Sequence, residues 1–360
     1  MLSKNWGMAM ILKTAEELHG IIKTMLLAAG AAEGHAETVA GHLVEAELAG
    51  VETHGIRPAW LYFKSIREGQ LLPKADPKIL EESATSALVS GQWTFGQVAA
   101  KHGMEIAIKK AGQSNISVVS LVQLHHIGRV GTYSEMAAEA GMIAIVVGSG
   151  YCKPVGRAAP YGGRERFLDT NPISIGVPSP AEPDGHPMLL DYATTYRAQG
   201  ALFLANMRGE EVPTDFVIDR DGNPATDSNI LDLGGAMLPF GRHKGHALMM
   251  AVEYLGRIFS GADEYIDPSK GDAMFRHQGV TMIVFKADLF RSMGEFAESV
   301  RQTSSQARAI APAPGFDRVR VPGDPEAEAR ADHRRSGIPI ADDIWGMLTE
   351  NAELLGVEIS

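Results

Sequence analysis

The sequence predicts an α/β fold, because short β-branched segments alternate with longer segments of helical periodicity. Residues 116–122, Ile-Ser-Val-Val-Ser-Leu-Val, have the length and composition of a strand buried on both faces. Helical patterns cover residues 97–111 and 133–140, and a second strand pattern covers residues 142–147. A chain of 360 residues with 45% hydrophobic content is long enough to form two or three domains with large cores.

The first predicted elements are two helices. Residues 14–17, Thr-Ala-Glu-Glu, have the form of a capping box, and an apolar stripe with spacings of three and four follows at Ala15, Leu18, Ile22 and Met25. This stripe predicts a helix that ends near Gly30. A second helix is expected over residues 36–48, with Gly50 as its stop. His54 then follows the helix end closely, in a turn or at the start of the next helix.

The order strand, helix, strand over residues 116–147 suggests a crossover unit, although the connection alone leaves the strand directions open. If the two strands are parallel, His126 and Ser149 follow their carboxyl ends, where open α/β sheets tend to hold ligands. Residues 149–163 contain glycines, prolines and cations, and predict a long loop with functional potential.

The rest of the chain continues the mixture of strands and helices. The elements predicted there are strands at 171–177, 188–190 and 280–285, a helix at 247–258 that stops by Gly261, and a final helix at 343–355. Residues 311–315 and 325–335 are expected to be exposed connectors.

Composition excludes several classes of function. A net charge of −11 without a long Lys/Arg run disfavours binding to nucleic acid or to an anionic membrane surface. No apolar run reaches the roughly 18 residues that a membrane-spanning helix needs. Cys152 is the single cysteine, so an intramolecular disulfide cannot form, and a cytoplasmic location is expected.

Several common catalytic motifs are absent from the sequence. Residues 148–150, Gly-Ser-Gly, lack the third glycine of G-x-G-x-x-G, which disfavours a standard Rossmann domain. Residues 243–246, His-Lys-Gly-His, lack the glutamate of an H-E-x-x-H helix, and cysteines do not cluster, so no metal is expected. No G-x-S-x-G elbow supports a hydrolase that would use water activated by His54 or His126.

An ordered set of motifs resembles the type 2 malate/L-lactate dehydrogenase family, which includes ureidoglycolate dehydrogenase, sulfolactate dehydrogenase, 2,3-diketo-L-gulonate reductase and the cyclic ketimine reductases. The matching blocks lie at residues 49–55, 126–128, 169–172, 190–195, 243–245 and 321–323. The resemblance implies NAD or NADP bound on a non-Rossmann mixed α/β fold, with a helical domain built from both termini. It also implies a homodimer.

Domain limits follow from the same resemblance. Residues 10–80 and 300–360 are expected to form the helical dimerisation domain. Residues 81–299 are expected to form the catalytic domain, with the core of cofactor binding at about 115–260.

The proposed reaction needs an acid or base, because hydride reaches the carbon of a keto acid or imine only if a proton reaches the oxygen or nitrogen in step. His54, between Thr53 and Gly55, matches the family's S/T-H-G motif and is the first candidate. His126 matches a histidine that acts as proton acceptor in the ureidoglycolate branch, so His54 and His126 can share the acid/base role. A histidine near a helix end that makes only local hydrogen bonds is the simpler alternative for His54. The neighbouring His125 is expected to be structural.

The resemblance also assigns cofactor and orienting residues. Asp191 is expected beside the nicotinamide, where a carboxylate can fix a histidine tautomer or accept from ligand hydroxyls. The remaining cofactor-binding candidates are Ser149, Thr170, Asn171, Ala193, His243, Lys244, Gly323 and Asp324. Turn formation and ordinary solvent exposure are the alternatives for these positions.

Two departures from the family's sequence pattern leave the identity of the substrate undetermined. Relatives usually carry arginine four positions after the motif histidine, but here Pro58 takes that place and Arg57 precedes it. Arg57 and Thr53 remain the substrate-binding candidates. Lys153 and Arg157 are candidates for an NADP 2′-phosphate, with solvent exposure as the alternative.

The sequence therefore predicts an NAD(P)-dependent oxidoreductase that acts on a small 2-oxo or 2-hydroxy acid. A cyclic ketimine reductase and a nucleotide-binding homologue with little turnover remain the alternatives.

Overall fold

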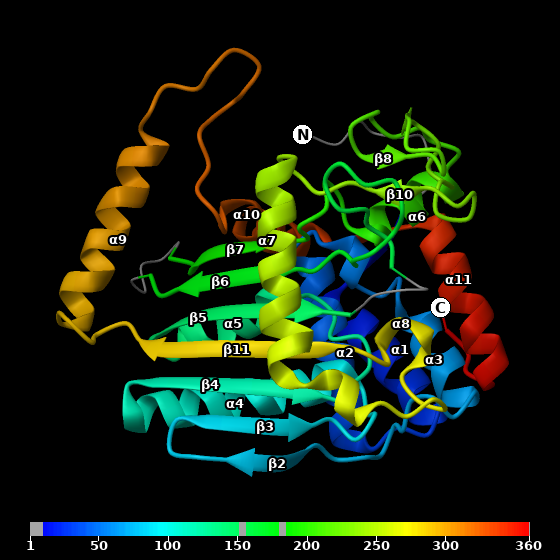
Figure 1. Ribbon diagram of the computed structural model, residues 1–360, viewed down its shortest axis with the longest axis horizontal. Helices are drawn as coiled ribbons and strands as arrows, with labels where there is room; N and C mark the ends of the chain where they lie inside the picture. The colour runs from blue at the N-terminus through cyan, green and yellow to red at the C-terminus, as the bar shows by residue number, and fades with distance from the viewer. Residues whose placement is uncertain (1–9, 151–155, 180–184, 360) are drawn as a thin grey trace.

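The computed structural model describes residues 10–150, 156–179 and 185–359 and confirms a mixed α/β fold (Figure 1). Its main sheet has seven strands in the order β2-β3-β4-β11-β5-β6-β7. All neighbouring pairs are antiparallel except β3 and β4. The strands are β2 Lys78–Glu82, β3 Ser86–Ser90, β4 Ile116–Val122, β11 Gly279–Lys286, β5 Met142–Ser149, β6 Ile173–Val177 and β7 Met188–Tyr192.

The sequence suggested a crossover unit over residues 116–147 and left the directions of its two strands open. β4 and β5 are both antiparallel to β11, so they run the same way and their carboxyl ends share one edge of the sheet. They are not neighbours, however, because β11 lies between them. His126 follows β4 and Ser149 is the last residue of β5, so both lie at this shared edge. Helices can still cover both faces of the sheet.

Helices cover both faces of the sheet (Figure 1). α4 (Gly96–Ser114) and α5 (Gly131–Glu139) pack on one face, against β4 and β5 respectively. α7 (His243–Glu253) begins earlier than predicted and continues as a π-helical turn, η2 (Tyr254–Ile258), on the other face. Alanines of α4 such as Ala107 and Ala111 are fully buried, which lets the helix approach the sheet closely.

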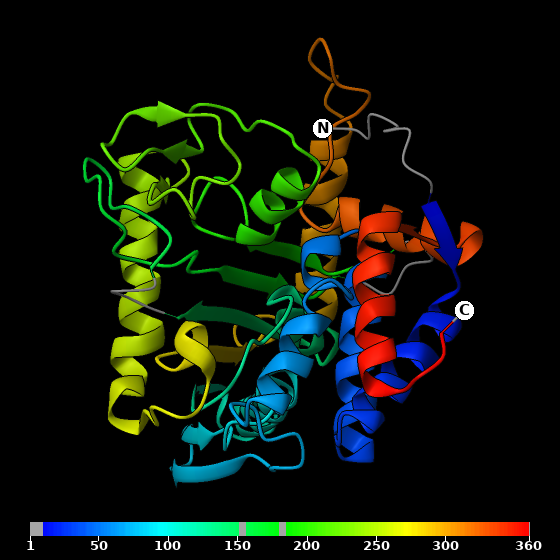
Figure 2. The ribbon, with the colours of Figure 1, turned by 90° about the vertical axis from the view of Figure 1, so that its right-hand side faces the viewer.

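The two ends of the chain form one helical layer beside the sheet (Figure 2). A short antiparallel pair, β1 (Met10–Lys13) with β12 (Ile338–Ala341), joins them. The helices that share this hydrophobic core are α1 Ala15–Ala28, α2 Glu33–Leu48, α3 Ala59–Arg67 and α11 Asp342–Leu355. The Thr14 capping box is confirmed, as is a helical unit drawn from both termini. The predicted domain limits stay a prediction.

The prediction of a connector at 325–335 is wrong, because α10 spans Asp324–Ser336. Its charge-rich sequence has no apolar stripe, but Pro325 suits the first turn, and basic residues in the last turn favour a helix C-terminus. The chain also forms the following elements, which the sequence analysis did not predict: α6 Gln199–Met207, α8 Asp272–Phe275, α9 Met293–Arg308, β8 Val217–Ile218, β9 Pro224–Ala225, β10 Ala236–Met237, η1 Glu52–His54 and η3 Ala262–Tyr265. Strands β1, β2, β3 and β12 were not predicted either.

Within residues 10–150, 156–179 and 185–359, no helix has the length and apolar character needed to cross a membrane. In the same ranges, His, Cys, Asp and Glu side chains form no group of three or more suited to a metal ion.

Candidate active site

A cavity of about 610 Å³ lies where the carboxyl ends of β4 and β5 face the helical layer. Its size is within the range typical of small-molecule sites. Segments far apart in the sequence build its walls: residues 51–58 around η1, residues 126–130 after β4, residues 148–150 at the end of β5, and residues 191–200, which include the last two residues of β7. The structure thus brings the separate sequence motifs to one place.

Most of the predicted site residues line this cavity. Those present in its walls are Thr53, His54, Arg57, His126, Ser149, Thr170, Asn171, Asp191 and Ala193. Four candidates are not among its lining residues. His243 and Lys244 are exposed at the start of α7, and Gly323 and Asp324 lie at the start of α10. Asp324 is buried there by ion pairs with His186 and Arg308.

The rings of His54 and His126 stack against each other at the wall of the cavity. Their ring centroids are 5.7 Å apart and their planes differ by 18°. η1 presents His54 directly after α2, as a short turn, and Thr53 Oγ1 lies 3.0 Å from His54 Nδ1. Residue 55, which follows His54, must be glycine, because a Cβ there would collide with the Glu47 side chain.

Tyr62 and Gln97 orient His126, and sequence reasoning missed both. Gln97 Nε2 donates to the Tyr62 hydroxyl oxygen at 2.6 Å. The hydroxyl hydrogen of Tyr62 is then directed to His126 Nδ1, 2.8 Å away. With Nδ1 acting as acceptor, a neutral His126 carries its hydrogen on Nε2. Had a helix been predicted after Pro58, Tyr62 would have been one of its residues. Nothing in the sequence, however, links Tyr62 to His126.

Both imidazoles are neutral at neutral pH. Burial, followed by the charges of Arg57 and Arg129, lowers the pKa of His54 to about 4. Burial also lowers the pKa of His126 well below its ordinary value, and the neighbouring His54 adds to the effect. His125 lies outside the cavity lining: it is fully buried, with Nε2 3.0 Å from Ser65 Oγ.

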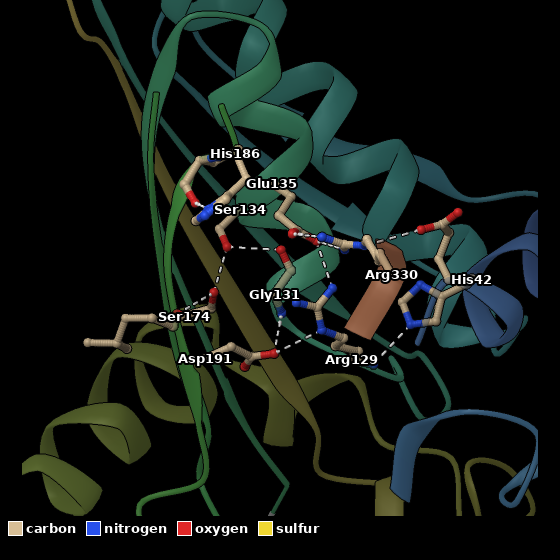
Figure 3. Close-up of polar contacts among 12 residues, drawn as sticks. His42, Arg129, Gly131, Ser134, Glu135, Ser174, His186, Asp191 and Arg330 are labelled. Carbon is tan, nitrogen blue, oxygen red and sulfur yellow. Dashed lines mark hydrogen bonds and ion pairs between the residues drawn. The ribbon is translucent and has the colours of Figure 1, made fainter. Parts of the chain in front are cut away.

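Asp191 contacts the backbone and an arginine rather than serving as a histidine partner (Figure 3). Its Oδ2 accepts from the Gly131 N–H at 2.9 Å and lies 3.7 Å from Arg129 Nε. Burial raises the pKa of Asp191 to about 6, although Arg129 and the Gly131 hydrogen bond oppose the shift. Asp191 was a candidate to fix the tautomer of a histidine. Thr53 instead contacts Nδ1 of His54, and Tyr62 contacts Nδ1 of His126.

Arg57 reaches the cavity although it precedes the usual position of the family arginine. Its Nη2 donates to the Thr53 carbonyl at 3.1 Å, and its guanidinium lies 5.2 Å from the centre of the Phe203 ring. A Cβ on Gly200 would come within 2.7 Å of Arg57 Nη2, so this glycine leaves room for the guanidinium.

Arg157 is not a solvated cation. It is buried, and its Nη1 donates to Asp169 Oδ2 at 2.6 Å. Both residues line the cavity, so the carboxylate already balances this charge. Lys153, the other candidate for a 2′-phosphate, lies outside the described residues.

Asn171 has a buried side-chain acceptor that no described residue uses. Its Nδ2 donates to the Met249 carbonyl and to Glu253 Oε2, each at 3.0 Å. Its buried Oδ1 has no hydrogen-bond partner among the described residues. A buried carbonyl oxygen without a donor is costly.

The fold and the paired imidazoles define an enzyme with a small-molecule cavity. The chain belongs to the malate/L-lactate dehydrogenase family, whose model matches residues 14–349, and it is therefore an oxidoreductase of the dehydrogenase type. It is 34% identical to L-sulfolactate dehydrogenase of Methanocaldococcus jannaschii over 353 residues, which are 97% of this chain and 98% of that protein.

Two further similarities extend over nearly the whole chain. The ureidoglycolate dehydrogenase (NAD(+)) of Escherichia coli O157:H7 is 32% identical over 345 residues, which are 94% of this chain and 95% of that protein. The crystal structure of malate dehydrogenase from Entamoeba histolytica superposes with a TM-score of 0.89 at 27% identity, covering 97% of this chain and 99% of that one.

Proposed function

We propose that this protein transfers hydride between a nicotinamide dinucleotide and a small 2-hydroxy or 2-oxo acid. The observation that carries the proposal is the pair His54 and His126, stacked at 5.7 Å on the wall of one cavity that also contains Arg57. Imidazoles supply and remove protons near neutral pH, and a guanidinium matches a carboxylate.

The bound dinucleotide supplies the hydride acceptor or donor. Asn171 would hold its carboxamide through the unpartnered Oδ1, with Ser149, Thr170, Asp191 and Ala193 lining the same space. His243 and Lys244 lie outside the cavity lining and remain candidates for the distal part of the dinucleotide, as do Gly323 and Asp324.

His54 serves as the acid/base group in this proposal. If its Nδ1–H is donated to Thr53 Oγ1, Nε2 keeps a lone pair that accepts the hydroxyl proton of a 2-hydroxy acid. His126 donates from Nε2 to the same substrate oxygen, because Tyr62 occupies its Nδ1. In the opposite direction the proton returns from His54 to the carbonyl oxygen as hydride reaches the carbon.

Arg57 pairs with the substrate carboxylate. It is anchored on the Thr53 carbonyl, which places the guanidinium on the same segment as His54. The short link between the two residues fixes the carboxylate and the reacting carbon relative to one another, and such positioning is a large part of catalysis.

Absorbance of the reduced nicotinamide band tests the function directly. NADH and NADPH are each offered with pyruvate, oxaloacetate, sulfopyruvate, glyoxylate derivatives and piperideine-2-carboxylate. We expect oxidation of at least one dinucleotide with a 2-oxo acid. Turnover of the cyclic imine alone would favour a ketimine reductase, and fluorescence quenching by NADH without any oxidation would favour a binding protein.

We also propose a cytoplasmic homodimer. The family resemblance supports the dimer, and the single cysteine supports the reducing cytoplasm. Light scattering coupled to size exclusion tests the assembly: a mass near 38.6 kDa, that of one chain, would contradict it.

A further inference from the structure

Helix α2 carries two buried polar side chains, His42 and Glu47, that take no part in the steps above. Each residue is 6% exposed, and neither is among the described residues that line the cavity. A polar group buried to this extent is costly unless it makes hydrogen bonds, so its partners indicate its role. For both residues, the partner is a backbone N–H in a segment that carries one of the two stacked histidines.

Glu47 holds the turn that carries His54. Its Oε1 accepts from the Ile56 N–H at 2.7 Å. Ile56 follows His54 by two residues, and its side chain is buried in the core of the helical layer. Gly55 lies directly against the carboxyl group, where any Cβ would collide with it. The glycine of the Thr-His-Gly motif therefore allows this carboxyl to reach the backbone of the turn.

His42 holds the segment that carries His126 in a similar way. Its Nε2 accepts from the backbone N–H of Arg129 at 2.9 Å (Figure 3). Burial lowers the pKa of His42 to about 3, so this nitrogen keeps its lone pair at neutral pH. Gly128 has a φ of +72°, and a Cβ there would collide with the His42 ring. The glycine of the second motif also makes room for a side chain of α2.

The two acceptors belong to one helix, although the segments that they hold are far apart in the sequence. Residues 42 and 47 are separated by about 7.5 Å along the axis of an α-helix, at a rise of about 1.5 Å per residue. The hydrogen bonds of the helix keep this separation fixed. The rings of His54 and His126, which the two held segments present, stack with their centroids 5.7 Å apart.

We propose that Glu47 and His42 are positioning residues for the reaction. Glu47 fixes the turn of His54, and His42 fixes the segment of His126. Helix α2 thereby sets the distance between the two imidazoles at the cavity wall. The inference rests on the proposed function of these histidines, because a displacement of about 1 Å at a reacting group can lower turnover about 100-fold.

The variants either keep or remove each acceptor. Glu47→Gln and His42→Gln keep a side-chain oxygen that accepts a hydrogen bond, whereas Glu47→Met and His42→Met do not. Burial raises the pKa of Glu47 to about 8, so the neutral glutamine amide matches the form present at pH 7. His35→Met is the matched control. His35 lies on the same helix and is 8% exposed, but it contacts the Pro73 carbonyl and Asp76, which do not line the cavity.

The first measurement is NMR of histidine rings labelled with carbon-13, assigned with His54→Gln and His126→Gln. Glu47→Met should shift the ring signal of His54, and His42→Met should shift that of His126. Each glutamine variant should keep the original signal, and His35→Met should change neither ring. Unchanged ring signals in both folded methionine variants overturn the proposal. Because no turnover is needed, this result is independent of the oxidoreductase function.

The second measurement is kcat in the dinucleotide assay. Glu47→Met and His42→Met should each lower kcat by about 10- to 100-fold while NADH quenches protein fluorescence with unchanged affinity, and the glutamine variants should stay within about threefold. In a His54→Gln background, Glu47→Met should lower kcat no further, because Glu47 acts through His54. An equal loss of kcat in His35→Met, or a full loss from Glu47→Met in the His54→Gln background, overturns the proposal. Absence of any dinucleotide oxidation contradicts the proposed function, and the ring signals still decide the positioning role.

Discussion

Replacement of Tyr62 by phenylalanine removes the hydroxyl that joins Gln97 to His126. The ring is fully buried, and its hydroxyl makes hydrogen bonds of 2.6 and 2.8 Å to these two residues. Each partner left unsatisfied costs about 1 to 2 kcal/mol, so we expect the free energy of unfolding to fall by about 2 to 4 kcal/mol. His126 also loses the contact that fixes its tautomer, and kcat/KM should fall by about 10- to 100-fold.

The assay combines urea unfolding with the oxidation of reduced dinucleotide by the preferred 2-oxo acid. Tyr133→Phe is the matched control, because the Tyr133 hydroxyl is equally buried but donates to the backbone carbonyl of Ile127. The control should lose stability by about 1 to 3 kcal/mol while keeping the pH profile of the reaction. If Tyr62→Phe keeps kcat/KM within about twofold, His126 is not oriented through Tyr62 for catalysis.

Three further substitutions test other parts of the site. His54→Gln should lower kcat by about 1000-fold while NADH still quenches protein fluorescence with unchanged affinity; a kcat near that of the unsubstituted protein would exclude His54 as the acid/base group. Glu47 is 6% exposed and accepts from the Ile56 N–H at 2.7 Å, and burial raises its pKa from 4.5 to about 8. The folded state therefore keeps a proton that the unfolded state loses, and stability falls as pH rises from about 4.5 to about 8, by about 3 kcal/mol at pH 7. Glu47→Gln should abolish this part of the dependence in urea unfolding, and parallel curves for the two proteins would contradict the protonated state. Arg157→Leu leaves the Asp169 carboxylate, 14% exposed, without its 2.6 Å partner and should cost about 2 kcal/mol of unfolding free energy; a loss below about 1 kcal/mol would show that water replaces the pair.

Local patterns predicted the elements whose signals are contained in a single segment. The Thr14 capping box and the β-branched run of β4 needed no distant partner, and both were found where expected. β11 was predicted as a strand, but its insertion between β4 and β5 depends on long-range pairing that no periodicity reports. α10 was missed because its helix is stabilised by terminal charges and an N-terminal proline instead of an apolar face.

The site shows the same limit. The motif histidines were recognised because residues next to them, such as Thr53, Gly55 and Gly128, form a local pattern. The groups that orient His126 come from elsewhere in the chain: Tyr62 from α3 and Gln97 from α4. Such polar networks are defined by three-dimensional packing, so a single sequence does not reveal which buried side chains they join.

A crystal structure with reduced dinucleotide and oxamate bound is the most direct measurement of the proposed chemistry. We expect oxamate in the cavity, with its carboxylate on Arg57 and its amide carbonyl oxygen about 3 Å from the imidazoles of His54 and His126. The nicotinamide carboxamide should donate to Asn171 Oδ1. Oxamate bound away from both histidines, or a nicotinamide ring outside this cavity, would contradict the proposed function.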